Sequence, residues 1–429
     1  MYENLKGKRL LFLGAIKSLC EPIQYAKEMG IYTIATDYLP DSPAKKVADK
    51  ACMVSTTDVD AVCQLCKDER VDGLFTGYMD GMLSYAREIC DRMGFPFYAS
   101  ENQIRLSHDK SFFRAKCIEY GVPCPKDYSE EVLNHGVEEA EVEFPIIVKP
   151  VDMYGGRGIS IARNKAELQK AVDYAYSFSP GKRIIVEEYL EGVEITATYT
   201  MKNGEISLSR LGDKYISQDH DDCQSQGDVL LLPSRYLEQY IASTDRGIHR
   251  MLKGMEATDG TCFFQGIANR EKIALFECGY RPNGSADYRH ISQENGINYI
   301  KMMIAHALTG EMQGYDLSQD NPRFKNYRVT YNLWAHDGII GNQSGLEEVR
   351  KLAHVTFAEY RHFIGDEITS EKPLLQAVFR AIISATDIET VKETILAIQK
   401  LVSVENVNGE NMLYQPFRVE RLNRTQEAS

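Results

Sequence analysis

Short apolar runs alternate with helical segments through residues 8–98, and this alternation constrains the fold more than any other feature of the sequence. Four strands are expected, at Arg9–Leu13, Tyr32–Thr36, Val47–Val54 and Gly73–Thr76. Helical patterns separate them, and strands that alternate with helices at this spacing form a parallel sheet covered by helices on both faces. The sequence therefore predicts a Rossmann-like α/β domain over residues 1–100.

The first turn of this domain bears on a dinucleotide role. It runs Gly14-Ala15-Ile16-Lys17-Ser18 and lacks the GxGxxG spacing of a dinucleotide-binding turn. Asp37, at the end of the second strand, is the one remaining feature typical of that role. A small α/β domain that helps to hold a substrate fits better than a dehydrogenase, although the dehydrogenase stays an alternative.

A lysine and a glycine-rich loop follow a later apolar strand. The strand Ile146–Val148 runs into Lys149, and it resumes near Ile159. The loop between them holds Gly155, Gly156, Arg157 and Gly158. Glycines let backbone N–H groups approach a polyphosphate closely, and the two cations offset its charge. The alternative is an ordinary hairpin, because glycine-rich turns also occur without a ligand.

Charged residues also lie at the ends of other predicted elements. Lys110 is in the first turn of a helix, where a cation opposes the helix dipole, so it is either a solvated lysine or a cation held beside an anion. Gln265 lies on an expected strand, Glu277 ends the next one, and Arg281 follows four residues later. This arrangement indicates either a site or a solvated turn with a salt bridge at its rim.

Composition excludes several classes of protein. A net charge of −13 argues against broad nucleic-acid binding, which requires a basic face. No apolar run reaches transmembrane length, and the N-terminus does not resemble a signal peptide. Ten cysteines scattered through predicted helices and strands indicate reduced thiols and a cytoplasmic protein. Cys63 and Cys66 form one CxxC inside a helical pattern and are expected to be packing residues rather than metal ligands.

Four motifs in order resemble the ATP-grasp superfamily over nearly the whole chain. They are HDKSFFR with Lys110, IIVKP with Lys149, YGGRGIS in the glycine loop, and VEEYLEGVE at residues 186–194. The resemblance is to the branch of carbamoyl-phosphate synthase and biotin carboxylase and to similar amino-acid ligases. It implies two phosphate lysines, a loop that closes over the β- and γ-phosphates, and an ATP-binding hinge. The hinge residues that it implies are Glu187, Glu188, Tyr189 and Leu190 for adenine and Glu194 for ribose.

The metal end of the motif departs from the family pattern. Where the family has E-x-N-x-R, this chain has Glu277-Cys278-Gly279-Tyr280-Arg281, and Gln265 stands where a second glutamate is usual. Mg²⁺ or Mn²⁺ is therefore expected on Glu277 and Gln265, with waters, nucleotide oxygens or Asp287 completing the set. The alternative is a chain that binds nucleotide without turning it over.

The resemblance implies an ATP-dependent carboxylate–amine ligase that works through an acyl phosphate, with Lys149 and Arg281 as catalytic residues. A bicarbonate-activating enzyme of the carboxylase or carbamoyl-phosphate type is the second reading. Asp287, Arg289 and His290 are candidate substrate-lining residues, and a solvated charge cluster is their alternative. Partners are expected to be small carboxylates and amines, with no nucleic acid and no membrane, in a possible homodimer.

The expected domains are an N-terminal domain (1–100), an ATP-grasp domain (101–310) and a C-terminal α+β domain (311–429). Within the second, residues 124–211 are expected to form a lid subdomain that carries the glycine loop. The hairpin turn Lys202-Asn203-Gly204 lies near the end of this lid. The segment 316–327 is expected to be a linker, and the charged tail from Val419 onward is expected to fray.

Overall fold

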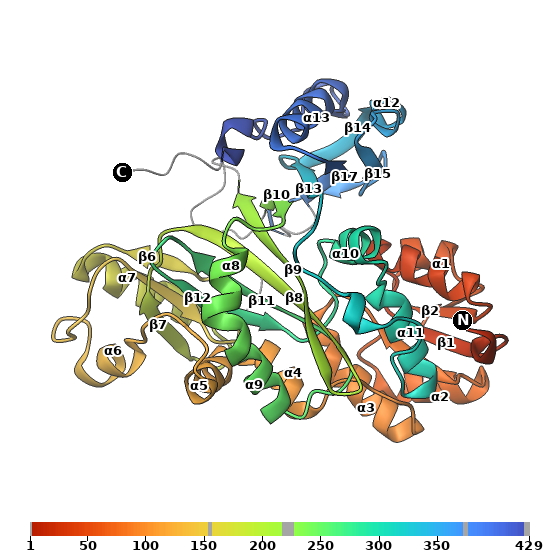
Figure 1. Ribbon diagram of the computed structural model, residues 1–429, viewed down its shortest axis with the longest axis horizontal. Helices are drawn as coiled ribbons and strands as arrows, with labels where there is room; N and C mark the ends of the chain where they lie inside the picture. The colour runs from red at the N-terminus through yellow and green to blue at the C-terminus, as the bar shows by residue number, and fades with distance from the viewer. Residues whose placement is uncertain (1, 153–156, 217–226, 372–375, 424–429) are drawn as a thin grey trace.

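The computed structural model describes residues 2–152, 157–216, 227–371 and 376–423. Its N-terminal part is the parallel sheet that the alternation predicts, with strand order β3-β2-β1-β4 (Figure 1). The strands are β1 (Arg9–Leu13), β2 (Tyr32–Thr36), β3 (Lys50–Cys52) and β4 (Gly73–Thr76). The helices that alternate with them are α1 (Cys20–Glu28), α2 (Val59–Asp68) and α3 (Leu83–Met93).

Successive residues of β1 face opposite sides of this sheet, as strand geometry requires. Leu10 and Phe12 pack in one core with α1 and with α11 (Tyr299–Thr309), whereas Leu11 packs against α2 and α3. A helix some 290 residues away in sequence thus completes one face of the N-terminal domain. Cys63 and Cys66 are free and buried in the second core, as packing residues would be.

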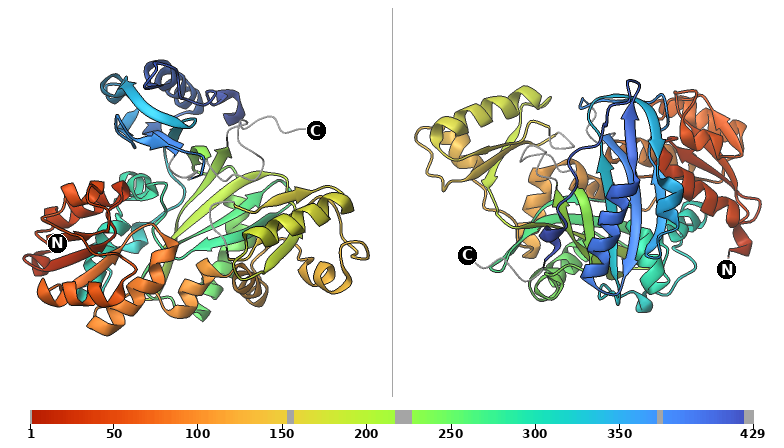
Figure 2. Two further views of the ribbon diagram at one scale, coloured as in Figure 1. Left: turned by 180° about the vertical axis from the view of Figure 1, so that it is seen from behind. Right: turned by 90° about the horizontal axis from the view of Figure 1, so that it is seen from above.

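A small antiparallel sheet and two helices form a separate subdomain, called the lid here after its expected role; β8 and β9, which the expected lid range also included, belong to the large sheet. Strands β5 (Ile146–Pro150), β6 (Ser160–Ala162) and β7 (Ile184–Glu188) have the order β6-β5-β7. Helix α7 (Lys165–Phe178), capped by the Asn164 side chain, packs on them through Leu168 and Ala171, and α6 (Ser129–His135) closes the subdomain. The lid projects from the rest of the molecule in the three ribbon views (Figures 1 and 2).

The largest sheet is antiparallel and has the order β12-β11-β8-β9-β10-β13-β17-β15. Its first five strands in sequence are β8 (Val193–Lys202), β9 (Glu205–Ile216), β10 (Gly227–Leu232), β11 (Gly260–Ala268) and β12 (Ile273–Gly279). The others are β13 (Tyr327–Trp334), β15 (Val355–Tyr360) and β17 (Ala377–Ala385). Because β10 pairs with β13, the sheet continues across the domain boundary expected near residue 310.

Helices pack on the part of this sheet that β8, β11 and β12 form. They are α4 (Glu101–His108), α5 (Lys110–Tyr120), α8 (Leu237–Tyr240) and α9 (Arg246–Gly254). A π-helical turn, Ile241–Asp245, joins α8 to α9, so the two form one continuous helix that is widened in its middle. Asp109 caps α5, which places Lys110 at the first helical position.

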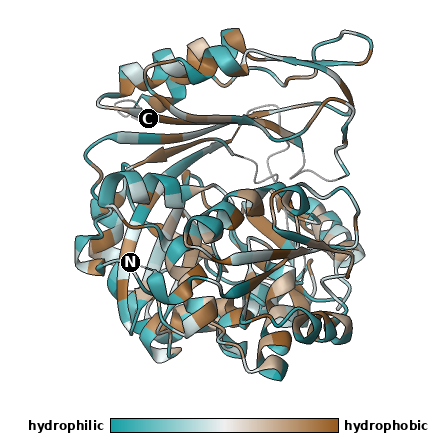
Figure 3. Ribbon diagram, turned by 90° about the vertical axis from the view of Figure 1, so that its right-hand side faces the viewer, coloured by the Kyte–Doolittle hydropathy of each residue, from teal (hydrophilic) through white to brown (hydrophobic). Residues whose placement is uncertain are grey.

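The C-terminal part adds a second small sheet, β16-β14-β18, to the large one. Its elements are β14 (Gly338–Ser344), β16 (Glu367–Ile368), β18 (Ser403–Asn406), α12 (Leu346–Arg350) and α13 (Ile388–Leu401). Figure 3 shows apolar residues along the strands that lie beneath the uppermost helix. The tail departs from its expected fraying, because Val419–Leu422 forms a 3₁₀ turn whose two end residues are buried.

The remaining helix, α10 (Asp287–Asn295), follows the loop after β12 and precedes α11. It lies between the N-terminal domain and the large sheet (Figures 1 and 2). None of the helices in the described ranges is long and apolar enough to cross a bilayer.

Candidate active site

The lysine at the end of β5 belongs to a buried group of three charges. Strand pairing places Ile147 opposite Glu187, and the Lys149 Nζ donates to the Glu187 carboxylate at 2.6 Å. Arg114, from α5, bonds the other oxygen of Glu187. Burial alone would raise the pKa of Glu187, but Lys149 and Arg114 hold this pKa below its usual value. Glu187 is thus a buried anion that fixes two cations, and its expected contact with adenine stays a prediction.

Lys110 lies close to this group from the other side. Burial lowers the pKa of Lys110, the nearby Lys149 lowers it further, and Glu277 and Glu187 act in the opposite sense. Two lysines from different elements are therefore close enough to repel each other, although each also has acids nearby. Two buried lysines that converge from different elements could serve a ligand with several negative charges.

The glycine loop is described only in part, because Gly155 and Gly156 lie outside the described residues. Arg157 is exposed, and Gly158 is buried with a φ of +76°, in the left-handed region that favours glycine. A Cβ on Gly158 would lie 2.7 Å from Pro150 and 2.8 Å from Phe178. Glycine at this position is thus required both by the backbone and by the close packing of the loop on the lid.

The hinge between the lid and the large sheet has a free backbone donor. The Tyr189 N–H donates to Pro145 O at 3.1 Å, but among the described residues the next N–H, that of Leu190, donates to none. The Glu188 side chain is held by Lys272 across the hinge. Glu194, at the start of β8, accepts hydrogen bonds from Lys214 at 2.8 Å and from Gln265 at 3.0 Å.

The two residues expected to bind metal lie directly opposite each other. Gln265 on β11 pairs with Glu277 on β12, next to a bulge in the ladder. Among the described residues no group of three or more His, Cys, Asp or Glu side chains is arranged to hold a metal ion. A site here would offer Mg²⁺ one carboxylate and one amide, which is compatible with an ion that keeps several waters and binds phosphate oxygens.

A phenylalanine explains why the family asparagine is missing at position 279. A Cβ on Gly279 would lie 2.2 Å from the ring of Phe263, its partner across the β11–β12 ladder. The same ring lies 5.0 Å from the Arg281 guanidinium carbon. The aromatic ring therefore occupies the space of an asparagine side chain and supports Arg281 instead.

Arg281 is anchored to the N-terminal domain. Its guanidinium pairs with Asp80, in the turn that follows β4, and donates to Pro282 O at 3.0 Å. The preceding residue, Tyr280, donates from its N–H to Ser107 Oγ at 2.6 Å. Asp80 is a site residue that sequence analysis missed; its position just beyond the carboxyl end of a parallel strand is the signal that could have indicated it.

Comparison with known proteins agrees with this fold. A family model described as the C-terminus of D-ala D-ala ligase matches residues 124–225. The structure superposes on that of an L-amino acid ligase from Bacillus licheniformis with a TM-score of 0.76 and 16% identity, covering 94% of this chain and 99% of the other. The chain resembles ATP-grasp proteins in sequence and in fold.

Carboxylases are also among its ATP-grasp relatives. The 2-oxoglutarate carboxylase small subunit of Hydrogenobacter thermophilus is 28% identical over 364 residues, 77% of this chain and 72% of that protein. Its biotin carboxylase domain, solved as a dimer with MgADP, ADP and bicarbonate, superposes with a TM-score of 0.78 and 20% identity, covering 95% and 91%. A formate-dependent phosphoribosylglycinamide formyltransferase from Nitratidesulfovibrio vulgaris is 28% identical over only 43% of this chain and 47% of its own length.

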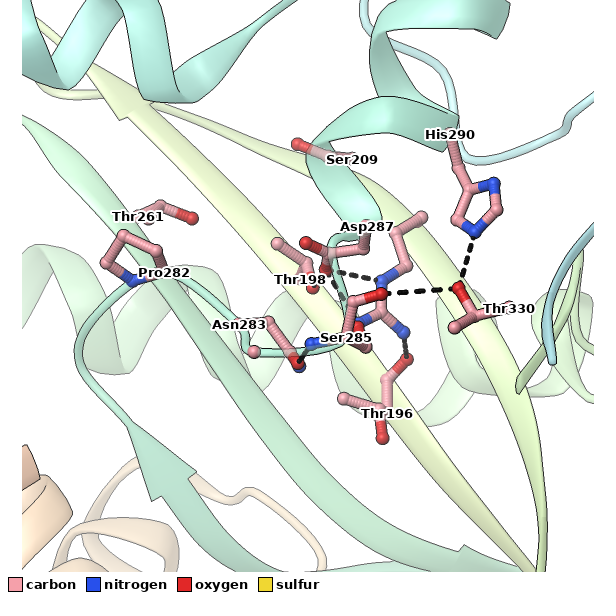
Figure 4. A network of polar contacts seen from close by, with 12 residues as sticks. Thr196, Thr198, Ser209, Thr261, Pro282, Asn283, Ser285, Asp287, His290 and Thr330 are labelled. Atoms are coloured by element: carbon pink, nitrogen blue, oxygen red, sulfur yellow. Dashed lines mark hydrogen bonds and ion pairs between the residues drawn. The ribbon is translucent and has the colours of Figure 1, made fainter. Parts of the chain in front are cut away.

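Asp287 does not lie where a metal or substrate contact was expected. It is fully buried, and one of its oxygens accepts from Arg210 Nε at 2.8 Å and from Thr198 Oγ1 at 2.6 Å (Figure 4). The other accepts from the Tyr299 hydroxyl. Both of its oxygens accept hydrogen bonds inside the fold, so Asp287 is a structural anion that joins α10 to the large sheet.

The two other candidate substrate residues have different surroundings. Arg289 is paired with Glu21 of α1 at 2.7 Å, and its guanidinium carbon lies 3.7 Å from the centre of the Phe357 ring, beside a cavity. His290 is buried and does not line that cavity; its Nε2 lies 2.8 Å from Thr330 Oγ1 (Figure 4). Arg289 thus stays a candidate substrate residue, whereas His290 is a core residue.

His290 should make the stability of the fold depend on pH. Burial and the nearby arginines, Arg210 first, hold the pKa of His290 well below its usual value. The unfolded chain therefore takes up a proton at this residue below about pH 6.5 while the folded chain does not, and stability falls with pH by up to about 1.4 kcal/mol per unit. Urea unfolding would be measured between pH 7.5 and 5.5, roughly one unit either side of the ordinary histidine pKa. The free energy of unfolding should depend less on pH for His290→Asn than for the wild type. Equal slopes of the two variants would contradict this.

Proposed function

We propose that the chain is an ATP-dependent carboxylate–amine ligase that releases ADP and phosphate. The observation that carries the proposal is the proximity of Lys110, Lys149 and Glu277, which come from a helix start, a lid strand and the large sheet. Two cations and a metal-binding carboxylate around one place suit the phosphates of a nucleotide better than any neutral ligand.

The residues of the hinge fit the rest of ATP. The unused N–H of Leu190 is a donor for a ring nitrogen of adenine, and Glu194 is an acceptor for ribose hydroxyls. Gly158 and the exposed Arg157 belong to the loop that would cover the phosphates, together with Gly155 and Gly156. One relative is known with MgADP bound, which supports the same pair of ligands for this chain.

Glu277 and Gln265 are the residues that would hold Mg²⁺. When bound, this ion neutralises charge on the β- and γ-phosphates and keeps them in line for transfer. The chain contributes little charge of its own to the metal, so the affinity for Mg²⁺ should depend strongly on the nucleotide. Glu194 links the two halves of the site, because it accepts a hydrogen bond from the same Gln265.

The proposed reaction has two steps. A carboxylate oxygen of the substrate attacks the γ-phosphorus, the bond to the β–γ bridging oxygen breaks, and an acyl phosphate and ADP form. An amine then attacks the acyl carbon, loses a proton, and phosphate leaves with the bonding electrons. Lys110 and Lys149 position the phosphates in the first step, and Arg281 stabilises the oxygens of the acyl phosphate in the second. Closure of the glycine loop would keep water away from that intermediate.

A carboxylase-type reaction is the second candidate. The carboxylase subunit is the relative that aligns with 77% of this chain, and its biotin carboxylase domain has the same fold. In that case bicarbonate would be the carboxylate that is phosphorylated, and the same residues would act on it. That domain is a dimer, which makes a homodimer a reasonable proposal for this chain as well.

The test is the release of ADP from ATP and Mg²⁺ across a panel of carboxylates and amines. We expect ADP, not AMP, and a rate that requires one carboxylate and one amine together. ADP release that requires bicarbonate alone would favour the carboxylase. Tight ATP binding without any turnover would favour a nucleotide-binding protein and would direct attention to Gln265 and Gly279.

A further inference from the structure

The cavity beside Arg289 is not lined by Glu277 and lies where several parts of the chain meet. Its volume is about 160 Å³, and its lining comes from the start of α1, the loop after β12, and strands β15 and β17. An apolar wall, which includes Tyr78 and Phe357, faces several charged groups. Concave sites with an apolar wall and convergent polar groups are the usual places for small ligands.

The charges that line this cavity do not balance. Four cations, Lys17, Arg289, Arg361 and Arg380, are present with two acids, Glu21 and Glu359. Glu21 is used by Arg289 at 2.7 Å. Glu359 is 3.9 Å from Lys17 and 3.9 Å from Arg361, so a single acid is shared at long range by two cations.

Arg380 has no acid within ion-pair distance among the described residues. Its Nε donates to Asn332 Oδ1 at 3.0 Å and one terminal nitrogen donates to Gly284 O at 3.1 Å, which are both neutral groups. Burial, reinforced by Arg361, lowers the pKa of Arg380 to about 9. Burial also lowers the pKa of Arg361 and of Lys17. Glu359, which lies opposite Arg380 across the β15–β17 ladder, is thus one acid near three cations, and buried cations that acids do not fully balance are costly unless a ligand neutralises them.

We propose that this cavity binds an anionic group of the ligase substrate, a carboxylate or a phosphate, between Lys17, Arg361 and Arg380. The proposal rests on the proposed function and adds that the substrate is acidic. Guanidinium groups bind the paired oxygens of carboxylates and phosphates well, and two of them are available here.

The position and the size of the cavity support this assignment. Gly284 lines it three residues after Arg281, and Tyr78 lines it two residues before Asp80, the partner of Arg281. The loop after β12 and the loop after β4 therefore each contribute residues both to the cavity and to the surroundings of Arg281. A cavity of about 150 Å³ holds a molecule of the size of benzene, so this one has room for an acidic end group but not for a nucleotide.

The test is anion binding by the full chain without nucleotide. Thermal unfolding and calorimetric titration would use butyrate, inorganic phosphate and the neutral butyramide, at ionic strength matched with sodium chloride. We expect saturable binding of at least one of the two anions and none of butyramide. The preferred anion then tells whether the substrate carries a second carboxylate or a phosphate.

Variants locate the binding. Arg361→Gln and Arg380→Gln should each weaken the anion at least tenfold, whereas Arg323→Gln, at an exposed arginine paired with Glu238, should leave it unchanged. If Arg380→Gln does not fold, Arg361→Gln decides alone. Binding of neither anion, equal binding of butyramide, or unchanged binding by the folded variants would overturn the proposal. ADP release is measured separately, so the failure of either proposal can be told from failure of the other.

Discussion

Glu277→Gln is expected to lower the rate of ADP release by a factor of about 100 to 1,000, the scale for loss of one charge-stabilising group in an active site. Glu277 is the acid of the Gln265–Glu277 pair, so the change leaves two neutral amides where the metal would bind. Because the hinge and the phosphate lysines are untouched, nucleotide affinity should persist. Initial rates and Mg²⁺ titrations of wild type and variant measure both effects.

Glu271→Gln is a matched control for this experiment. Glu271 lies in the exposed turn between β11 and β12, on the same hairpin as Glu277 but at its far end. This variant should have the turnover and the Mg²⁺ dependence of the wild type. If Glu277→Gln titrates with Mg²⁺ as the wild type does, the metal binds elsewhere.

Asp287→Asn is expected to lower the free energy of unfolding by about 3–5 kcal/mol, because it leaves the Arg210 guanidinium buried without an anion. Both side chains are fully buried, and the two are 77 residues apart in sequence. Urea unfolding can be followed through the fluorescence of Trp334, the single tryptophan of the chain, which lies on β13 of the same sheet.

Two further variants show whether the loss comes from the unpaired charge. In the double variant Arg210→Met, Asp287→Leu both charges are absent, and the loss should be smaller than for Asp287→Asn alone. Arg323→Ala, at an exposed ion pair, should leave the unfolding curve unchanged. A loss below about 1 kcal/mol for Asp287→Asn, the scale of an exposed ion pair, would contradict the structural role assigned to the pair.

Much of the fold follows from local sequence patterns. The strands Arg9–Leu13 and Gly73–Thr76 have the expected bounds, because a short apolar run between polar turns leaves few other choices. Helix α11 was not expected, and its packing on the N-terminal sheet depends on contacts between residues far apart in sequence. No local pattern reports such a contact.

The candidate site was predictable where a charge ends a strand. Lys149 and Glu277 follow apolar runs, in which packing alone gives no reason for a charged residue. The structure places both near Lys110. Asp287 has the same polar character but lies against a distant arginine. The reason for glycine at position 279 could not be predicted either, because it depends on the Phe263 ring across the β11–β12 ladder.

Transfer of ¹⁸O from the carboxylate to phosphate tests most directly whether a carboxylate oxygen attacks the γ-phosphate. The carboxylate that supports ADP release would be labelled with ¹⁸O and incubated with the protein, ATP, Mg²⁺ and the amine. The proposed mechanism moves a carboxylate oxygen to phosphorus, so mass spectrometry should find ¹⁸O in the released phosphate. Release of unlabelled phosphate, or of AMP and pyrophosphate, would contradict it.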